Sequence, residues 1–225
     1  MNSILLESDL LILKDNEDKE INIKKDINTK IVLINENEAK NRYIFNIEEN
    51  SNVKINIFDV SKEINRNITV NLNGKNSYVE LNISSISLNE NIYEVNIFHN
   101  EKNTHSQTNL HGLAIDDNKI VFKNNGTIKK GSIKSILNQD NKIITLGKNN
   151  SKIEPNLFID EYDIEASHGA YVGKFKEEDI FYLKTRGLSE ENANKLLIKG
   201  FLMGSFDEKE QLEEIIDKYR RWNNE

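Results

Sequence analysis

The amino-acid sequence predicts a mainly β protein with a small α-helical region at its C-terminal end. From about residue 21 to residue 164, apolar and polar residues alternate in short runs, as in Val53, Ile55 and Ile57. A period of two is typical of a strand with one buried face. After Lys176 the apolar residues recur at helical spacing instead, which predicts helices. Short strands of this kind fit either an antiparallel sandwich or a parallel solenoid, and the alternation does not distinguish the two.

The strands follow one another through the β region, separated by polar residues. Further alternating runs are Ile68, Val70 and Leu72, then Val79, Leu81 and Ile83, then Tyr93, Val95 and Ile97, and finally Leu113 and Ile115. Polar clusters separate the runs at Asn73-Gly74, Asn89 to Asn91, Asn124 to Gly126, and Asn149 to Ser151. We interpret these clusters as turns, because asparagine and glycine tolerate backbone conformations that other residues avoid.

Three helices are predicted after the last strand. The first begins at Glu177 to Asp179 and ends before Gly187, since acidic residues favour a first turn and glycine a helix end. Ser189 is placed to cap the second helix. Asp207, with Glu210 three residues later, predicts a capping box for the third. The predicted apolar stripes are Ala193, Leu196, Leu197 and Phe201 in the second helix, and Leu212, Ile215, Ile216 and Tyr219 in the third.

Composition argues against several classes of partner and of function. The 225 residues carry a formal net charge of −7 and include no cysteine, whereas proteins that bind nucleic acid or anionic membranes need clustered positive charge. The sequence shows no signal peptide and no apolar run near the roughly 18 residues of a membrane span. We therefore expect a cytoplasmic protein without disulfides. Common catalytic motifs, such as a Walker lysine loop or a nucleophile elbow, are missing, so we expect a non-catalytic role.

The segment from residue 165 to residue 202 holds the most distinctive residue choices of the chain. It resembles the C-terminal signature of the SufB/SufD family, the scaffold subunits of the SUF machinery that assembles iron–sulfur clusters, and is most similar to the SufD members. The matching residues are Ser167, His168, Gly169, Ala170, Val172, Gly173, Phe181, Tyr182, Leu183, Arg186 and Gly187. Weaker matches continue upstream through Thr104, Ser106, Gly112, Leu146, Gly147, Pro155 and Leu157.

This resemblance implies a fold and a set of partners. The family core is a right-handed parallel β-helix, so the implied organisation is an N-terminal cap of strands at 1–50, a SufBD-like core at 51–174, and a helical region at 175–225. The helical region is implied to dock the ABC-type ATPase SufC, and exposed strand edges to pair with a SufB-like subunit. The chain is shorter than a full SufD, so the N-terminal helical region of longer relatives is expected to be missing. The implied role is a scaffold, with ATP hydrolysis in SufC.

His168 is the residue that the resemblance implicates at the site of cluster assembly. It stands between the small residues Ser167 and Gly169, where we expect the backbone to bend sharply. Ala166 occupies the position where many family members carry cysteine, so this chain offers iron no thiolate. We expect no cofactor to be held stably by this chain alone. A transient iron–sulfur cluster is expected at a subunit interface, with cysteine from a partner and an imidazole nitrogen from His168.

The remaining signature residues divide into two groups under the resemblance. Partner contacts are implied for Phe181, Tyr182, Leu183, Arg186 and Gly187, and structural roles for Ser167, Gly169, Ala170 and Gly173. A simpler interpretation makes the first group a helix face packed on the last coil, and His168 a hydrogen-bonded turn residue. His105, His111, Asp116 and Asp117 lie close in sequence, but their spacing fits no established metal-ligand pattern.

Two other functions and two assembly states stay open. One alternative is a β-helix that has lost the family's cysteine and only organises partner proteins. A carbohydrate-active β-helix needs a cluster of acids, whereas Asp116, Asp117, Asp140 and Asp160 are scattered along the sequence. The sequence does not distinguish a heterodimer with SufB from a homodimer.

Overall fold

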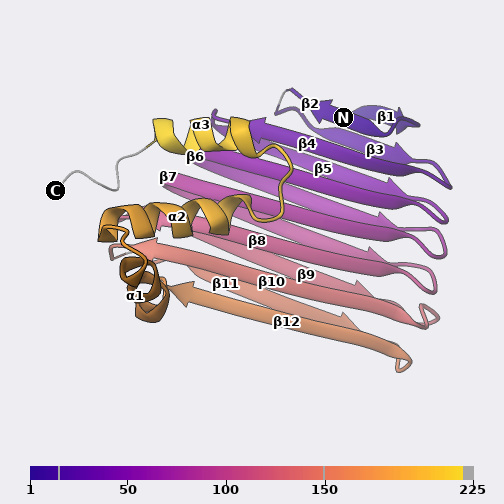
Figure 1. Cartoon of the computed structure of the whole chain (residues 1–225). Helices are drawn as coiled ribbons and strands as arrows, with labels where there is room; N and C mark the ends of the chain where they lie inside the picture. Colours follow the sequence, from indigo (N-terminus) through magenta and orange to yellow (C-terminus); the bar gives the residue numbers. More distant parts are fainter. Residues whose placement is uncertain (15, 149, 220–225) are drawn as a thin grey trace.

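The computed structural model describes residues 1–14, 16–148 and 150–219. The chain forms a parallel β-solenoid of about 6 turns, with 58% of its residues in strands and 3 short helices at the C-terminal end. Figure 1 shows the coils stacked from β1 and β2 at one end to β12 at the other, with the helices along one side. The predicted β-helix with a C-terminal helical region is therefore confirmed.

The elements follow the chain in a simple order. The strands are β1 (Asn2–Leu6), β2 (Leu10–Leu13), β3 (Lys19–Ile23), β4 (Asn28–Asn35), β5 (Ala39–Ile47), β6 (Asn52–Leu72), β7 (Tyr78–His99), β8 (His105–Ile115), β9 (Lys119–Ile128), β10 (Ser135–Leu146), β11 (Lys152–Ile159) and β12 (Ile164–Gly173). The helices are α1 (Glu177–Thr185), α2 (Glu190–Met203) and α3 (Lys209–Lys218).

Two walls of parallel strands make up the solenoid. One wall contains β2, β4, β8, β10 and β12 and the other contains β1, β3, β5, β9 and β11, while the long strands β6 and β7 run through both. Neighbouring coils pair residue for residue, and the one shift in register between β6 and β7 lies between Ser61 and Glu63. Each residue therefore lies in line with a counterpart one coil away.

This continuous pairing corrects two of the predicted turns. Asn89 to Asn91 lie inside β7, where the strand passes from one wall to the other, and Asn91 Nδ2 donates to Ser85 Oγ at 2.9 Å. Asn124 to Gly126 lie inside β9. Both predictions were wrong because ladder bonds between coils override the local turn preference of asparagine. Asn149 of the fourth predicted turn lies outside the described residues.

The lumen of the solenoid holds the main apolar core. Alternate residues of each strand point inward and stack in columns from coil to coil, as Ile31, Ile55 and Leu81 do. Every residue of the alternating runs predicted from the sequence is buried, although Leu113 and Ile115 face outward into a second cluster. Burial contributes roughly 25 cal/mol per Å² of apolar surface, so stacking like side chains stabilises the whole row of coils.

A row of left-handed residues forms one corner of the solenoid. Asp26, Asn50, Asn76, Asn103 and Lys134 occupy equivalent positions in successive coils, with φ between 56° and 61°. The amide nitrogens of Asn50, Asn76 and Asn103 each donate to the side-chain oxygen one coil earlier, at 2.9, 2.9 and 3.2 Å. Asparagine and aspartate tolerate this conformation better than other residues with a side chain. Lys134 breaks the pattern, because it adopts the same backbone angles without an amide to extend the row.

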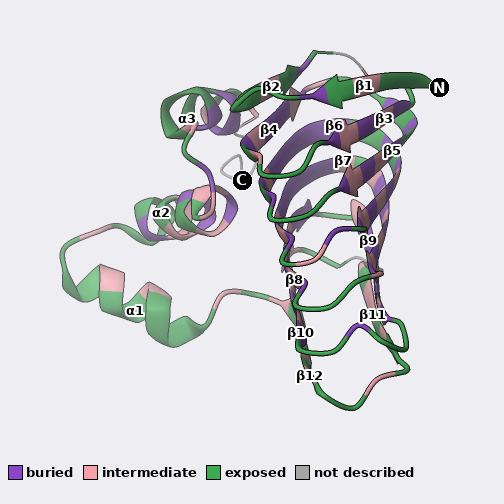
Figure 2. Cartoon of the chain, turned by 90° about the vertical axis from the view of Figure 1, so that its right-hand side faces the viewer, coloured by how far each residue is buried: buried purple, intermediate pink, exposed green. Residues whose placement is uncertain are grey.

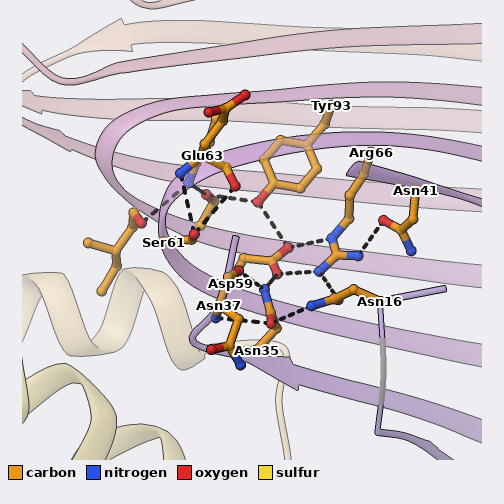
Figure 3. A network of polar contacts seen from close by, with 12 residues as sticks. Asn16, Asn35, Asn37, Asn41, Asp59, Ser61, Glu63, Arg66 and Tyr93 are labelled. Carbon is orange, nitrogen blue, oxygen red and sulfur yellow. Dashed lines mark hydrogen bonds and ion pairs between the residues drawn. The ribbon is translucent and has the colours of Figure 1, made fainter. Parts of the chain in front are cut away.

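A buried ionic network crosses the lumen at the corner of the early coils (Figure 3). Arg66 binds both oxygens of Asp59, with Nε 3.0 Å from Oδ2 and Nη2 2.7 Å from Oδ1. Its remaining donors reach Asn41 Oδ1 at 2.7 Å and Asn16 Oδ1 at 2.9 Å. The Tyr93 hydroxyl lies 3.0 Å from Asp59 Oδ2. Arg66, Asp59 and Tyr93 are fully buried, so neighbouring protein groups rather than water must compensate the two charges.

Two of the three helices cover the outer face of one wall. Outward-facing side chains of the solenoid pack against α2 and α3 in a second apolar cluster, which contains Phe58, Val60, Ile86, Leu113, Ile115, Ile144, Ile198, Leu202, Phe206, Leu212, Ile215 and Ile216. Figure 2 shows the buried sides of α2 and α3 turned toward the sheet. Across the described residues, no helix combines the length and apolar character needed to cross a bilayer.

The helices depart from the sequence prediction in two details. The capping box is wrong, because α3 begins after Glu208 without a side-chain cap and Asp207 instead accepts a hydrogen bond from Lys30 Nζ at 2.9 Å. In α2 the predicted stripe is rotated: Leu196 is exposed, and the apolar residues that are buried are Ala193, Ile198 and Leu202. Contacts with the solenoid wall, rather than spacing alone, decide which side of α2 faces inward.

Replacing Arg66 by methionine is expected to lower the free energy of unfolding by about 3–5 kcal/mol, because it leaves the buried Asp59 carboxylate without its cation. Urea denaturation followed by circular dichroism measures the change. The matched control is Arg42→Met at an exposed position of β5, where the expected change is within about 0.5 kcal/mol. A loss below about 1 kcal/mol for Arg66→Met would show that the network contributes little.

Candidate functional site

His168 lies in β12, in the terminal coil of the solenoid. Among the described residues β12 pairs only with β10, so its second edge is open. The predicted sharp bend at this position is wrong, because β12 runs unbroken from Ile164 to Gly173 and Gly169 has no positive φ. Figure 2 shows this last coil exposed at the end of the stack. His168 is thus presented by a regular strand edge rather than by a turn.

Strand register gives the orientation of His168. Ser167 pairs with Asn138 and His168 with Gln139 in the neighbouring strand β10. Ser167 Oγ donates to Asn138 Oδ1 at 2.7 Å on the outer face. Because successive residues of a strand point to opposite faces, His168 faces the lumen side, in line with the buried Gln139. His168 is itself exposed because no described coil covers it.

The small residues of the signature shape the strand around His168. Ala166 and Ala170 lie on the same face of β12 as His168, so neither supplies a ligand there. A side chain at Gly173 would come within 2.8 Å of Tyr171 Oη. The Tyr171 hydroxyl donates to the carbonyl of Lys174 at 2.6 Å, so Gly173 makes room for the tyrosine at the end of the strand.

The open end of the solenoid carries exposed apolar side chains. They are Phe158, Ile159, Tyr162, Tyr171 and Val172 in the last coil. An exposed apolar group beside an unpaired strand edge is typical of a surface that contacts another protein chain.

The helix α1 presents the predicted partner-binding residues to solvent. It has no buried residue, and Phe181 and Tyr182 are 69% and 56% exposed. The Arg186 guanidinium lies over the Tyr182 ring, 5.3 Å from its centroid. Gly187 ends the helix with φ +91°, a conformation that glycine adopts without strain. Leu183 is half-buried. Figure 2 shows α1 projecting away from the solenoid.

A cleft of about 640 Å³ separates α1 from α2 and the end of β10. Its lining includes the apolar side chains of Leu146, Phe175, Ile180 and Phe181, with Lys184 at its side. The apolar side of α1 is therefore incompletely covered by this chain. A helix that exposes its aromatic residues beside an open cleft is suited to contact with a further protein.

His111 joins the helical region to the solenoid wall, a role that the sequence did not reveal. Its ring stacks on Phe201 with centroids 4.6 Å apart, and its Nδ1 lies 2.9 Å from the Phe201 carbonyl oxygen. Ser84 Oγ donates to the carbonyl of Leu202 at 2.7 Å. These two side chains satisfy carbonyls in the last turn of α2, which the helix itself leaves unpaired. His111 and Phe201 are 90 positions apart in the sequence, so no local sequence signal predicts this contact.

The other histidines have structural contacts. His99 is buried between Thr104 Oγ1 at 2.7 Å and Ser106 Oγ at 2.8 Å, and burial lowers its pKa to about 4. The His105 ring packs edge-on against Tyr78, 4.9 Å between centroids. His168 is the exposed member of the four histidines.

The described residues contain no group of three histidine, aspartate or glutamate side chains that could converge on a metal ion. An iron–sulfur cluster needs several ligands, usually thiolates. At the open edge, the exposed His168 offers one imidazole donor.

Comparison with known proteins gives a consistent picture. The family model described as the SufBD core domain of SUF system FeS cluster assembly matches residues 20–201. The chain is 30% identical to the iron–sulfur cluster assembly protein SufD of Bacillus subtilis over 159 residues, which cover 67% of this chain and 36% of the relative.

Two further relatives agree with this match. The iron–sulfur cluster assembly protein SufD of Escherichia coli is 27% identical over 141 residues, covering 61% of this chain and 33% of the relative. An iron–sulfur cluster assembly SufBD family protein of Pyrococcus horikoshii is 58% identical over 40 residues, covering 18% of this chain and 9% of that protein. The chain spans about a third of the length of the two SufD relatives.

The buried His99 predicts loss of stability in acid. The unfolded chain binds a proton at this residue below about pH 6.5, whereas the folded chain resists it until about pH 4. Stability therefore falls as the pH drops through this window, by about 3 kcal/mol at pH 4. Urea denaturation between pH 7 and pH 4 measures the slope. His99→Gln is expected to flatten the slope, and an unchanged slope in that variant would assign the acid sensitivity elsewhere.

Proposed function

This chain belongs to the SufB/SufD core family of iron–sulfur cluster assembly, and from that membership we propose that it is a SufD-like scaffold subunit of a SUF assembly complex. It has no catalytic role of its own, and the ATPase activity belongs to a SufC partner. The exposed His168 at the open end of the solenoid is the observation that carries the proposal. The complex works in the cytoplasm, where reducing conditions keep the partner's thiols free.

SufC docks on the C-terminal helical region. The support is the exposure of α1, which buries none of its residues against the rest of the described chain. Phe181 and Tyr182 supply aromatic anchors, and Arg186 stacks on the tyrosine ring. Aromatic and arginine side chains contribute most of the binding energy in many interfaces. The cleft beside α1 gives such a partner an apolar surface to fill.

Movement of SufC reaches the solenoid through α2. When two SufC copies close on ATP, they pull on α1 and α2. His111 and Ser84 hold the last turn of α2 against β8 and β7, and β8 pairs with β10, the neighbour of β12. A displacement of α2 thus acts on the same wall that carries His168.

A SufB-like subunit pairs along the open edge of the last coil. The unpaired side of β12 offers backbone groups for strand addition, and the exposed Phe158, Tyr162 and Val172 offer apolar contacts. The assembling cluster is cargo at this interface. His168 supplies one imidazole nitrogen, and because Ala166 replaces cysteine in this chain, the partner supplies the thiolates.

A second candidate function is a scaffold that organises partners without contacting the cluster. The lack of any cysteine favours it. It shares the docking surfaces with the first candidate and differs only in the role of His168.

Phe181→Asp is expected to weaken co-purification with SufC by about tenfold or more, because a lost aromatic anchor commonly costs about 2 kcal/mol. The matched variant is Phe158→Asp, which places the same charge on the last coil. It is expected to weaken pairing with SufB and leave SufC binding unchanged. Equal SufC binding by wild type and Phe181→Asp would contradict docking through α1.

His168→Ala is expected to abolish cluster accumulation on the assembled complex while SufB and SufC still bind. The visible absorption of the purified complex after reconstitution with iron and sulfide measures the cluster. His105→Ala removes a histidine from β8, two strands away from β12 on the same wall, and serves as the control, with cluster yield unchanged. Normal yield in His168→Ala would favour the scaffold that only organises partners.

A further inference from the structure

The lumen of the solenoid changes from apolar to polar as it approaches His168. One inward-facing column reads Ile31, Ile55, Leu81, Thr108, Gln139 and His168 in successive coils. The first three positions hold aliphatic side chains in the apolar core, and the last three hold polar ones. Polar residues in a lumen are costly unless they are hydrogen-bonded, so their concentration at the end with His168 calls for a physical reason.

A hydrogen-bonded layer spans the lumen directly beneath the last coil. Asn124 Nδ2 on one wall donates across to Thr108 Oγ1 and to Asn141 Oδ1, both at 2.8 Å. Gln139 Nε2 donates to the Asn124 carbonyl at 3.2 Å, and Asn141 Nδ2 donates to the carbonyl of Gly169 at 3.0 Å. The layer is therefore tied to β12 at the residue that follows His168.

Two acceptor atoms of this layer are left without a partner. Gln139 Oε1 and Asn124 Oδ1 are buried and make no hydrogen bond, although Gln139 is only 4% exposed and Asn124 fully buried. In both residues the amide nitrogen is already held, which fixes the oxygen as the free end. A buried carbonyl oxygen of this kind is satisfied only by a donor.

We propose that Gln139 is the positioning residue for His168, with its Oε1 accepting a hydrogen bond from one imidazole N–H. His168 and Gln139 are partners in register on neighbouring strands, about 4.8 Å apart along the column. Both face the lumen, as the outer contact between Ser167 and Asn138 requires. Within this column, His168 is the exposed residue that neighbours Gln139 in register.

The consequence is chemical and rests on the proposed function. A neutral imidazole with one nitrogen bound to an amide oxygen keeps a single tautomer, and its other nitrogen presents a lone pair away from the lumen. That lone pair suits a divalent metal ion such as Fe²⁺ at the open edge, beside thiolates from a partner. Gln139 acts on the metal only through His168 and does not itself bind it.

The test is the tautomer of His168 in the full chain, read from the ¹⁵N shifts of its ring nitrogens at a pH where the ring is neutral. His168→Asn identifies the resonances. Gln139→Met keeps the side-chain volume and removes the acceptor, so the ratio of the two tautomers is expected to change by about fivefold or more. Gln139→Glu restores an acceptor and is expected to bring back the bias of the wild type. Gln107→Met, the same change on the outer face of β8, is expected to leave the ratio unchanged.

The outcomes separate this inference from the proposed function. Equal tautomer ratios in wild type and Gln139→Met overturn the role of Gln139, whatever the chain does in cluster assembly. If Gln139→Met does not fold, a wild-type ratio matching that of free imidazole overturns it equally. The measurement needs neither a partner nor a cluster. A normal bias in a chain that fails to support cluster assembly therefore refutes the function and leaves the contact in place.

Discussion

In-register parallel stacking is the constraint on which the rest of this structure depends. Each residue lies in line with its counterpart one coil away. A position that faces the lumen in one coil is therefore followed by a position that faces the lumen in the next. The lumen columns and the corner row of Asn50, Asn76 and Asn103 both follow from this rule. The buried pair of Arg66 and Asp59 is tolerated because Asn41 from an earlier coil and Tyr93 from the next coil supply further hydrogen bonds.

The same rule makes the two ends of the stack different from its middle. An end coil has only one neighbour, so its inward residues are exposed and its backbone edge is free. His168 gains its accessibility in this way, without a loop or a turn to display it. The helices α2 and α3 cover the outer face of one wall instead of this open end, which leaves the coil with His168 free while α2 remains attached to the wall beside it.

The sequence predicted much of this fold because one-sided burial imposes a simple alternation. Val53, Ile55 and Ile57 point to the lumen as expected. Alternation carries no information on how strands pair, and the parallel arrangement was predicted from the family signature alone. Asn91 and Asn124 were misplaced as turn residues, because the ladder bonds that keep them in strands come from coils about 30 residues away.

The candidate site was predicted in part for the same reason. The signature located His168 and the exposed aromatic residues of α1, but not the bond from His111 to the end of α2. Gln139 was also missed, since a lone glutamine in a strand shows no sign of facing a lumen until the register is known. Both residues act through neighbours that are distant in the sequence, and local sequence patterns do not encode such neighbours.

Lys134, at the corner that leads into β10, gives the end of the solenoid with β12 a property that the earlier coils lack. It holds the left-handed corner conformation at φ +59° where its predecessors are asparagine or aspartate, and such a conformation costs an ordinary side chain roughly 1–2 kcal/mol. The row of side-chain amide bonds ends at Asn103, because lysine has no side-chain amide with which to extend the row toward β12. The final coil is therefore expected to detach at a lower free energy than its neighbours. This lower local stability would let the strand edge that bears His168 adapt its shape to an incoming subunit. The earlier coils, which are linked by side-chain amides, would keep a fixed geometry.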